Sequence, residues 1–448
     1  MKGQIPSEQL LERASRRAEA AELCEMRSLE LPVRFRAGAL ESVKSVETAG
    51  RALRLIKDGR LGFSTTTDLT DDKTVIGNAL ESAQFGDPAP FAFPAKRDPS
   101  AVRCFDPEVE TLDEQRLIAL GGEIVEKIKA YDPELQIEVS VTKTLEEVRL
   151  LNTSGLELSD RRTLFSISID VTRAREGDIF MVYDAASSRR FQDVDGLGLA
   201  ERVVEKLRLS ETVAKGETKA MPVVFSPRGT LVLLLPLMLG LNGRQVFLGT
   251  SPLKGKLDEQ AFDARFSLVD DGRLDFAPRS APFDDEGVPT AEKPLIEGGV
   301  VKRFLYDLKT AAQAGAEPTG NGFKSSGFFG GGFRRPPDVA PTTWLVPPGA
   351  TGLEQILEDL DEALLVEQVI GLGQGNVLSG AFSNNVSVGF LVRRGEIVGR
   401  VKNTMIAGNV YELLKDKLIA VGDRAEWVFG MLKAPAIAVD GVGVASKS

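Results

Sequence analysis

The sequence has no histidine among its 448 residues, and this absence excludes a wide range of chemistry. Histidine is the commonest metal ligand and the usual general base near neutral pH. Without it, Ser–His–Asp and Cys–His catalysis, histidine-based zinc sites and two-histidine metal triads are all removed. Cysteine cannot replace it over most of the chain, because Cys24 and Cys104 are followed by no further thiol. We therefore expect this chain to hold no zinc of its own.

Basic blocks, a disulfide framework and long apolar runs are also missing. Lys and Arg are scattered over a chain of net charge −10 and pI near 5.0, so we expect no nucleic-acid partner. The most apolar run, TLVLLLPLMLGLNG (230–243), is shorter than the roughly 20 residues of a membrane span and contains Pro236. We therefore expect no membrane association. The N-terminus lacks the apolar core of a signal peptide, and with the sparse cysteines this predicts a cytoplasmic protein.

The remaining composition predicts an α+β protein of two domains. Apolar residues make up 42% and charged residues 27%, a globular balance, and the length exceeds one ordinary core. Residues 1–212 alternate helical and strand patterns, which predicts helices packed on an antiparallel sheet. Residues 213–222 are polar without periodicity and are predicted as a linker. Residues 223–448, richer in Gly and Pro, are predicted as a mostly-β domain with a few buried helices.

Local patterns predict several elements of the first domain. Residues 7–26 read as a charged amphipathic helix. Asp58-Gly59 follows an alternating segment and predicts a tight turn between two strands. Helices are predicted after Asp71-Asp72 and over 113–132, where apolar residues recur at helical spacing. The stretches between residues 134 and 187 that alternate polar and apolar side chains predict antiparallel strands with one wet face.

The run 230–243 is predicted to be a buried core helix. Ser226 can cap its start, Pro227 suits the first helical position, and Gly240 or Gly243 can end it in a left-handed turn. Pro236 should bend it, and leucine on every side predicts burial all round.

Three other segments have more than one interpretation. Asp284, Asp285 and Glu286 precede Gly287 and could hold a hard cation, but an acidic turn whose carboxylates cap nearby N–H groups is favoured. The string GLGQGN (371–376) lacks dinucleotide-binding spacing and is predicted as a glycine-rich loop. Residues 327–338, GFFGGGFRRPPD, are predicted as a flexible loop.

From about Val33 onward the chain resembles the TldD/PmbA family, the modulator-of-DNA-gyrase proteins, in its PmbA/TldE-like branch that lacks the zinc motif. In the first domain the resemblance rests on RALRLIKDGRLGFSTTTDL, where Arg54, Gly59, Gly62 and Thr65 match the family pattern. In the second it rests on the segments SPLKGKLDEQAF, LVDDG, PFDDEGVPT, LIEGGVVKRFLYDLKTAAQAG, TGNG and SGAFSNNVSVGFLVRRGEIVGRVKNTMIAGNVYELL. Their order and spacing together make the resemblance specific.

The catalytic branch of that family carries an H-E-x-x-x-H motif on a helix at the start of the second domain, with a cysteine further on. There zinc polarises the peptide carbonyl and the glutamate takes a proton. Matching GLNG (240–243) to the family's turn places Leu234 and Leu235 at the His-Glu pair and Leu239 at the second histidine. The resemblance therefore implies a metalloprotease-like second domain with a degenerate metal site.

The function implied by the resemblance is that of a non-catalytic subunit in a cytoplasmic TldD/TldE-type zinc protease that cleaves peptides or unfolded proteins. Zinc is then expected in a TldD-like sibling, with a homodimer as the alternative assembly. Gly380, Phe382 and Ser383 are the segment expected to face the substrate chamber, with a purely structural hairpin approach as the alternative. Two other functions stay open: a stand-alone binding pseudoenzyme, and a metal hydrolase that uses the oxygen ligands at positions 284–286.

Overall fold

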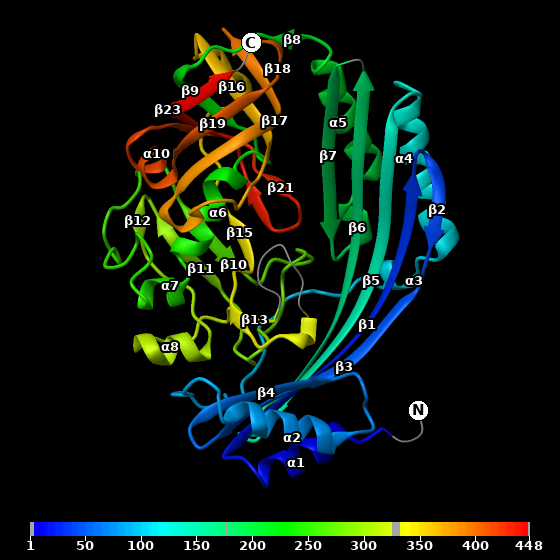
Figure 1. Cartoon of the computed structure of the whole chain (residues 1–448), viewed down its shortest axis with the longest axis vertical. Coiled ribbons are helices and arrows are strands. Elements are labelled where there is room, and N and C mark those ends of the chain that lie inside the picture. The colour runs from blue at the N-terminus through cyan, green and yellow to red at the C-terminus, as the bar shows by residue number, and fades with distance from the viewer. Residues whose placement is uncertain (1–3, 176, 325–331, 447–448) are drawn as a thin grey trace.

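A long antiparallel sheet forms one side of the molecule in the computed structural model, which describes residues 4–175, 177–324 and 332–446 (Figure 1). Its strands pair in the order β4-β3-β1-β5-β6-β7, with β2 beside β1, so that β7 is an edge strand. Figure 1 shows β5 and β6 running nearly the full height of the molecule. The strands are β1 (Ala20–Arg36), β2 (Ala39–Val43), β3 (Val46–Lys57), β4 (Arg60–Thr66), β5 (Gln136–Asn152), β6 (Glu157–Arg175) and β7 (Asp178–Ser188).

Helices cover this sheet at two places. Figure 1 shows α4 and α5 beside the long strands and α1 and α2 at the opposite end. Asp113 and Asp195 cap α4 and α5, and both helices turn buried leucine, isoleucine and valine side chains toward the sheet. This arrangement confirms the predicted α+β class. The helices of this half are α1 (Ser7–Ser15), α2 (Asp72–Ala83), α3 (Pro107–Thr111), α4 (Glu114–Lys129), α5 (Gly196–Leu209) and the short 3-10 helix η1 (Phe191–Asp193).

The predicted helix over residues 7–26 is wrong beyond Ser15. The chain leaves the helix there and enters β1, whose first residues pair with β3 on one side and β5 on the other. Ala21 and Leu23 are fully buried in that position. Backbone pairing on both sides and this burial override the helix propensity of the Ala-, Glu- and Leu-rich sequence.

The predicted turn at Asp58-Gly59 and the predicted helix after Asp71-Asp72 are confirmed. Asp58 and Gly59 have φ angles of 51° and 68° between β3 and β4, as a tight hairpin turn with two left-handed residues requires. Asp71 accepts a hydrogen bond from Thr74 N at 3.0 Å and so caps α2.

The second half contains an eight-stranded sheet in the order β16-β9-β23-β19-β17-β18-β8, with β20 beside β23. β16 pairs with both β9 and β17, so the strands from β16 to β17 in this order form a closed ring. β23 lies between β9 and β19, inside the sheet. The strands are β8 (Val213–Ala214), β9 (Lys219–Phe225), β16 (Glu362–Ile370), β17 (Ala381–Arg393), β18 (Glu396–Val401), β19 (Thr404–Asn409), β20 (Leu418–Val421) and β23 (Ile437–Ser446).

A six-stranded sheet in the order β12-β11-β10-β15-β22-β21 and the two-stranded sheet β13-β14 lie beside it. The strands are β10 (Leu268–Asp271), β11 (Glu292–Glu297), β12 (Val300–Val301), β13 (Gly322–Phe323), β14 (Asp338–Val339), β15 (Thr343–Leu345), β21 (Glu426–Val428) and β22 (Leu432–Ala434). The helices are α6 (Leu231–Gly240), α7 (Gly243–Phe247), α8 (Leu308–Ala314), α9 (Leu353–Glu358), α10 (Val410–Asp416), η2 (Gly332–Arg334) and η3 (Val377–Ser379).

The two halves share apolar packing. One buried cluster joins Ile167 of the first sheet and Leu207 of α5 to Val224 and Phe390 of the eight-stranded sheet. The segment 213–222 holds β8 and the first part of β9. Throughout the described ranges, no helix is both long enough and apolar enough to cross a membrane.

Candidate functional site around helix α6

Helix α6 begins later than its sequence predicts. Ser226 and Pro227 form a turn before the helix, in which Ser226 O accepts from Thr230 N at 3.0 Å and Ser226 Oγ accepts from Gly229 N at 3.3 Å. The hydroxyl therefore stabilises this preceding turn, and the first helical residue is Leu231. The helix ends at Gly240 as predicted, but Leu241, a right-handed residue, follows it in place of the expected left-handed turn.

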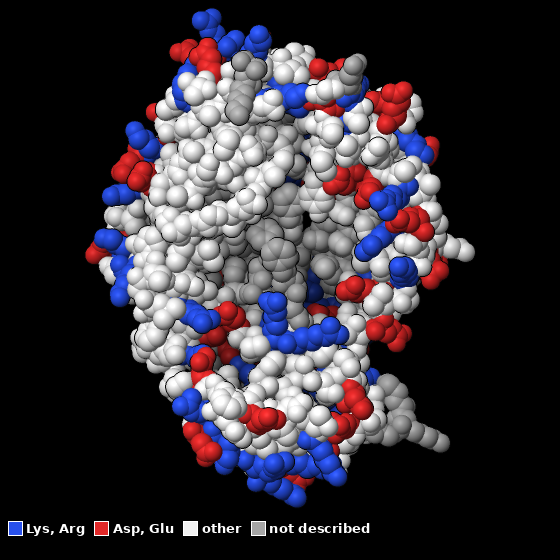
Figure 2. Space-filling model, viewed as in Figure 1, with Lys and Arg blue, Asp and Glu red and all other residues white. Residues whose placement is uncertain are grey.

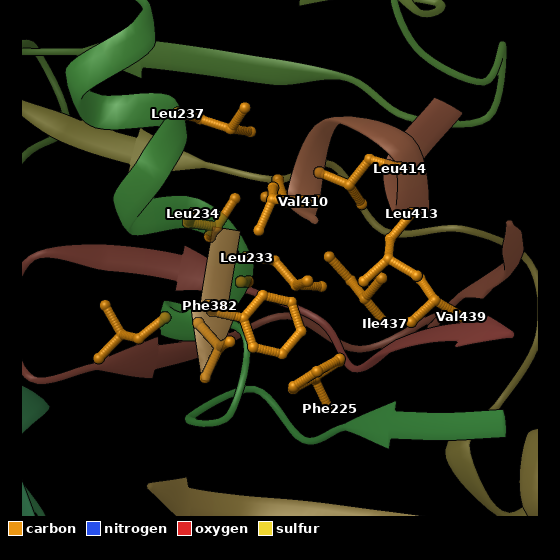
Figure 3. Close-up of a cluster of buried hydrophobic side chains, with 14 of the residues drawn as sticks. Phe225, Leu233, Leu234, Leu237, Phe382, Val410, Leu413, Leu414, Ile437 and Val439 are labelled. Atoms are coloured by element: carbon orange, nitrogen blue, oxygen red, sulfur yellow. The ribbon is translucent and has the colours of Figure 1, made fainter. Parts of the chain in front are cut away.

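Leu234 points into the core, whereas one face of α6 is partly exposed. Leu234 has no exposed surface and lies among Leu237, Val410 and Leu414 (Figure 3). Leu235 and Leu239, by contrast, are partly exposed, as is the residue Met238 between them. The prediction of burial on all sides is wrong for this face, since side chains four positions apart share one side of a helix.

The side chains on α6 do not fit a zinc ion. Zinc in proteins is bound by Cys, His, Asp or Glu, and a leucine side chain offers no lone pair. The place that the family resemblance assigns to the first histidine is filled by Leu234 inside a cluster of buried hydrophobic side chains (Figure 3). Over residues 4–175, 177–324 and 332–446, no three His, Cys, Asp or Glu side chains are grouped so that they could hold a metal ion.

The acidic segment forms a closed turn in which backbone groups bind the carboxylates. Asp284 Oδ1 accepts from Glu286 N at 3.0 Å and from Val288 N at 2.9 Å, and Oδ2 accepts from Gly322 N at 2.8 Å. Burial, with Glu286 close by, raises the pKa of Asp284 well above its ordinary value. Asp285 Oδ2 accepts from Lys324 N at 2.6 Å. These bonds match the interpretation of an acidic turn.

Glu286 leaves this turn and reaches the first half of the chain. Its Oε1 lies 2.6 Å from Arg54 Nη1, and its Oε2 accepts from Leu308 N at 2.7 Å. Arg54 also donates from Nε and Nη2 to Glu22 Oε1, at 2.9 Å and 2.6 Å. Three buried charges therefore connect β1 and β3 to the acidic turn. Nearby Asp307, which caps α8, has a pKa raised to about 6 by burial and by Glu286.

The segment expected to face the substrate chamber is mostly interior. Phe382 is 9% exposed and packs against Phe225, with ring centroids 6.4 Å apart (Figure 3). Gly380 is buried against the ring of Tyr411 and has a φ of 81°, a conformation that favours glycine. Ser383 alone of the three is exposed.

The two glycine-rich segments differ in environment. Residues 371–376 form a surface turn in which Gly371, Gly373 and Gly375 have positive φ angles, which confirms the predicted loop. Of the predicted loop 327–338, residues 327–331 lie outside the described residues. In the remainder Phe333 is 4% exposed and packs against Gly50 of β3, where a side chain would collide with its ring.

An apolar cleft lies at the junction of the two halves and was not predicted from the sequence. Its volume is about 460 Å³, and it reaches from β7 across the turn before α6 to β16. Side chains that line it include Met181, Tyr183, Leu231, Val232, Ile370 and Phe429. Figure 2 shows this face of the molecule hollowed between the halves, with Lys or Arg along the lower edge of the hollow.

The backbone of β7 is available at this junction. Gln368 of β16 bonds with its side chain to both the N–H and the C=O of Tyr183. The N–H and C=O of Tyr183 therefore point away from β6. Because these groups alternate in direction along an antiparallel strand, the N–H and C=O of Ile179 and Met181 also point away from β6. Ile179 and Met181 are 72% and 53% exposed. The continuous apolar run from Ile179 to Tyr183 was the available signal, because it indicates a strand with apolar side chains on both faces.

Three family models match consecutive parts of the chain. They are described as PmbA/TldA metallopeptidase domain 1 (residues 21–83), central domain (107–211) and C-terminal domain (218–446). The third match alone covers more than half of the sequence.

Individual relatives agree with these matches. An uncharacterised protein of Methanocaldococcus jannaschii is 28% identical over 92% of this chain and 94% of its own length. The metalloprotease PmbA homolog of Haemophilus influenzae is 25% identical over 93% and 90%. The crystal structure of TldE from Thermococcus kodakarensis has the same fold, with a TM-score of 0.87 at 24% identity over 98% of this chain and 99% of that one. The chain is thus a member of the PmbA/TldD metallopeptidase family.

Proposed function

We propose that this chain is a non-catalytic, PmbA/TldE-like subunit of a cytoplasmic metalloprotease whose zinc is held by a TldD-like sibling. The observation that carries the proposal is the composition of α6, in which the resemblance assigns Leu234, Leu235 and Leu239 to the places of the family's metal motif. The absence of histidine from the whole sequence supports it, since no slip of register can supply the missing ligands. Relatives named metalloproteases support the involvement in peptide cleavage.

The junction of the two halves offers a physical role for such a subunit. The outward backbone groups of Ile179 and Met181 can pair with an extended peptide, which would add a strand beside β7. Their exposed side chains and the apolar cleft can contact the side chains of that peptide. In this proposal the chain helps to hold a substrate in extended form while the sibling supplies the cleavage chemistry.

The proposal is tested by purifying this chain alone, a sibling that carries H-E-x-x-x-H, and the mixture. We expect a stable complex, zinc in proportion to the sibling, and peptidase activity that requires the sibling. Metal content measured by mass spectrometry and cleavage of unstructured peptides are the readouts. Chelator-sensitive cleavage by this chain alone would refute the proposal, and failure to form any stoichiometric complex would favour the stand-alone binding protein.

The peptide-binding role has its own test in Met181→Pro and Met181→Ala. Proline removes an outward N–H without breaking a bond to β6, so the sheet should persist while strand addition is lost. Alanine shortens the side chain and keeps the N–H. We expect the complex with Met181→Pro to cleave peptides with a raised KM, and the alanine variant to keep a KM nearer that of the unmodified complex. Equal KM values in all three would exclude pairing at this strand.

The hydrolase alternative predicts that Asp284→Asn, Asp285→Asn and Glu286→Gln together abolish turnover by this chain while the fold stays intact. The hydrogen bonds of the acidic turn favour instability as the outcome.

A further inference from the structure

A second cleft at the junction of the halves is lined by three arginines. Its volume is about 230 Å³, and Arg162, Arg189 and Arg279 all reach it. Glu146 is the one carboxylate among the lining side chains in the described part of the chain. We call this cleft the arginine pocket; its other lining residues are Thr144, Thr163, Leu164, Pro278, Ala281, Phe323 and Pro341.

Arg189 is a buried cation that has no carboxylate partner among the described residues. It is 6% exposed, and its Nε and Nη1 donate to Ala277 O at 3.1 Å and Thr163 O at 3.2 Å. Carbonyl oxygens hold the guanidinium in place but do not neutralise it. Burial lowers the pKa of Arg189, and the carboxylates of Glu146 and Asp160 offset this only in part.

The other two arginines of the pocket have different neighbours. Arg162 is balanced by Asp160, with Nε 2.5 Å from Oδ2, and by Glu146 at 4.0 Å. Arg279 donates to the carbonyl oxygen of Pro341 at 3.2 Å; burial lowers its pKa, and Asp270 acts in the opposite direction. Three guanidinium groups thus line a cavity with room for a small group, and Glu146 is the one carboxylate among its described lining residues.

We propose that the arginine pocket binds a carboxylate group of a peptide. A guanidinium presents parallel N–H donors that match the two oxygens of a carboxylate, and such charge-assisted bonds are strong in a site shielded from water. A bound anion would also offset the cost of burying the charge of Arg189. That the ligand is a peptide rests on the proposed function, whereas the preference for a carboxylate rests on the pocket alone. The carboxylate can come from a free C-terminus or from an Asp or Glu side chain.

The test uses the full chain without any sibling, so that its outcome is independent of complex formation. Binding is measured by calorimetry for four probes: a short peptide with a free C-terminus, its C-terminal amide, the amide with one internal Glu, and inorganic phosphate. We expect either carboxylate-bearing peptide to bind more tightly than the plain amide, and the stronger of the two identifies the source of the carboxylate. Equal binding of all three peptides, or binding of phosphate alone, would overturn the proposal.

Substitutions of the pocket arginines test whether the carboxylate binds in this pocket. Arg189→Met keeps the length of the side chain and removes its charge, and should weaken carboxylate binding at least about tenfold. Arg116→Met is the matched control, because Arg116 is exposed on α4, away from the pocket. Arg279→Met provides a second variant if Arg189→Met does not fold, and it should weaken the same probe. Unchanged affinity in the folded Arg variants would exclude the pocket as the site.

Discussion

Arg54 of β3 and Glu286 of the acidic turn are in direct contact, with Nη1 2.6 Å from Oε1, although 232 positions separate them in the sequence. The same guanidinium binds Glu22 of β1, and all three side chains are nearly inaccessible to water. Both Arg54 and Glu286 belong to the segments that carry the resemblance to the family. The structure gives them a connecting role between the two halves of the molecule.

Replacing Arg54 by Met should destabilise the protein strongly. The substitution leaves two buried carboxylates without a cation, and breaking a buried ion pair in this way costs about 3–5 kcal/mol. Urea unfolding measures the loss. Arg16→Met is the control, because Arg16 pairs with Glu12 at the surface, where such pairs contribute about 1 kcal/mol or less. Equal losses in both variants would contradict a stabilising role for the buried triad.

Asp307 should make stability depend on pH in a mildly acidic range. Its pKa is raised to about 6, above the value near 3.9 expected in the unfolded chain. The folded state therefore binds the Asp307 proton more tightly than the unfolded chain does. This adds about 3 kcal/mol to the free energy of unfolding below pH ~4, and the gain is lost as the pH rises to about 6. Asp307→Asn keeps a capping side chain but not the proton equilibrium. The stability of the unmodified protein relative to this variant should fall between those pH values.

Asp71→Asn is the control for that measurement. Hydrogen bonds from Thr74 lower the pKa of Asp71, so its contribution to stability changes with pH in the opposite direction to that of Asp307. Its contribution is present above pH ~3.9 and is lost on further acidification. The stability difference between the unmodified protein and Asp71→Asn should therefore stay constant between pH 4 and 6. A change there as large as that of Asp307→Asn would argue against the assignment.

Leu234→Ala should cost more stability than Leu239→Ala. Both substitutions remove the same atoms from α6, but Leu234 is fully enclosed and Leu239 is partly exposed. Truncating a buried leucine costs about 2–5 kcal/mol because a cavity remains, and a partly exposed one should cost less. Thermal or urea unfolding of the two variants compares them. A larger loss for Leu239 would mean that the helix presents the other face to the core.

Phe382→Ala and Ser383→Ala separate packing from substrate contact. Phe382 fills the core beside Phe225, so its truncation should cost about 3–5 kcal/mol. Ser383 is exposed, and its variant should stay within about 0.5 kcal/mol of the unmodified protein. If this segment faces the substrate chamber, Ser383→Ala should alter peptide turnover by the complex without a change in stability. Unaltered turnover would remove the segment from the substrate path.

Gly50→Ala should be destabilising only while Phe333 is present. A Cβ on Gly50 would lie 2.1 Å from the Phe333 ring, so the ring must move, at a cost of about 1–3 kcal/mol. In the background Phe333→Ala, the same glycine substitution should cost much less. A double-mutant cycle measures the coupling, and additive losses would show that the two residues are not in contact.

Patterns with a local cause were predictable from the sequence. The turn at Asp58-Gly59, the capped start of α2 after Asp71 and the apolar nature of α6 follow from nearby residues alone.

Features that depend on distant pairing were not predictable. The segment from Ala20 to Met26 has a helical composition, and its strand conformation comes from β3 and β5 on either side. The contact of Arg54 with Glu286 and the arginine pocket likewise join residues remote in sequence. The exposed face of α6 could not be read from a run of leucines, because an all-apolar helix gives no periodicity that marks its sides.

The position of β23 between β9 and β19 makes assembly of the second half dependent on late contacts. Phe225 pairs with Ile437, so the interior of this sheet is completed only after the long intervening chain has been synthesised. Until then β9 and β19 each present an unpaired inner edge that can associate with other chains. Removal of residues 437–446 should therefore yield a chain that aggregates rather than a shortened, folded protein. Pairings of such high sequence separation also predict slow folding of this half.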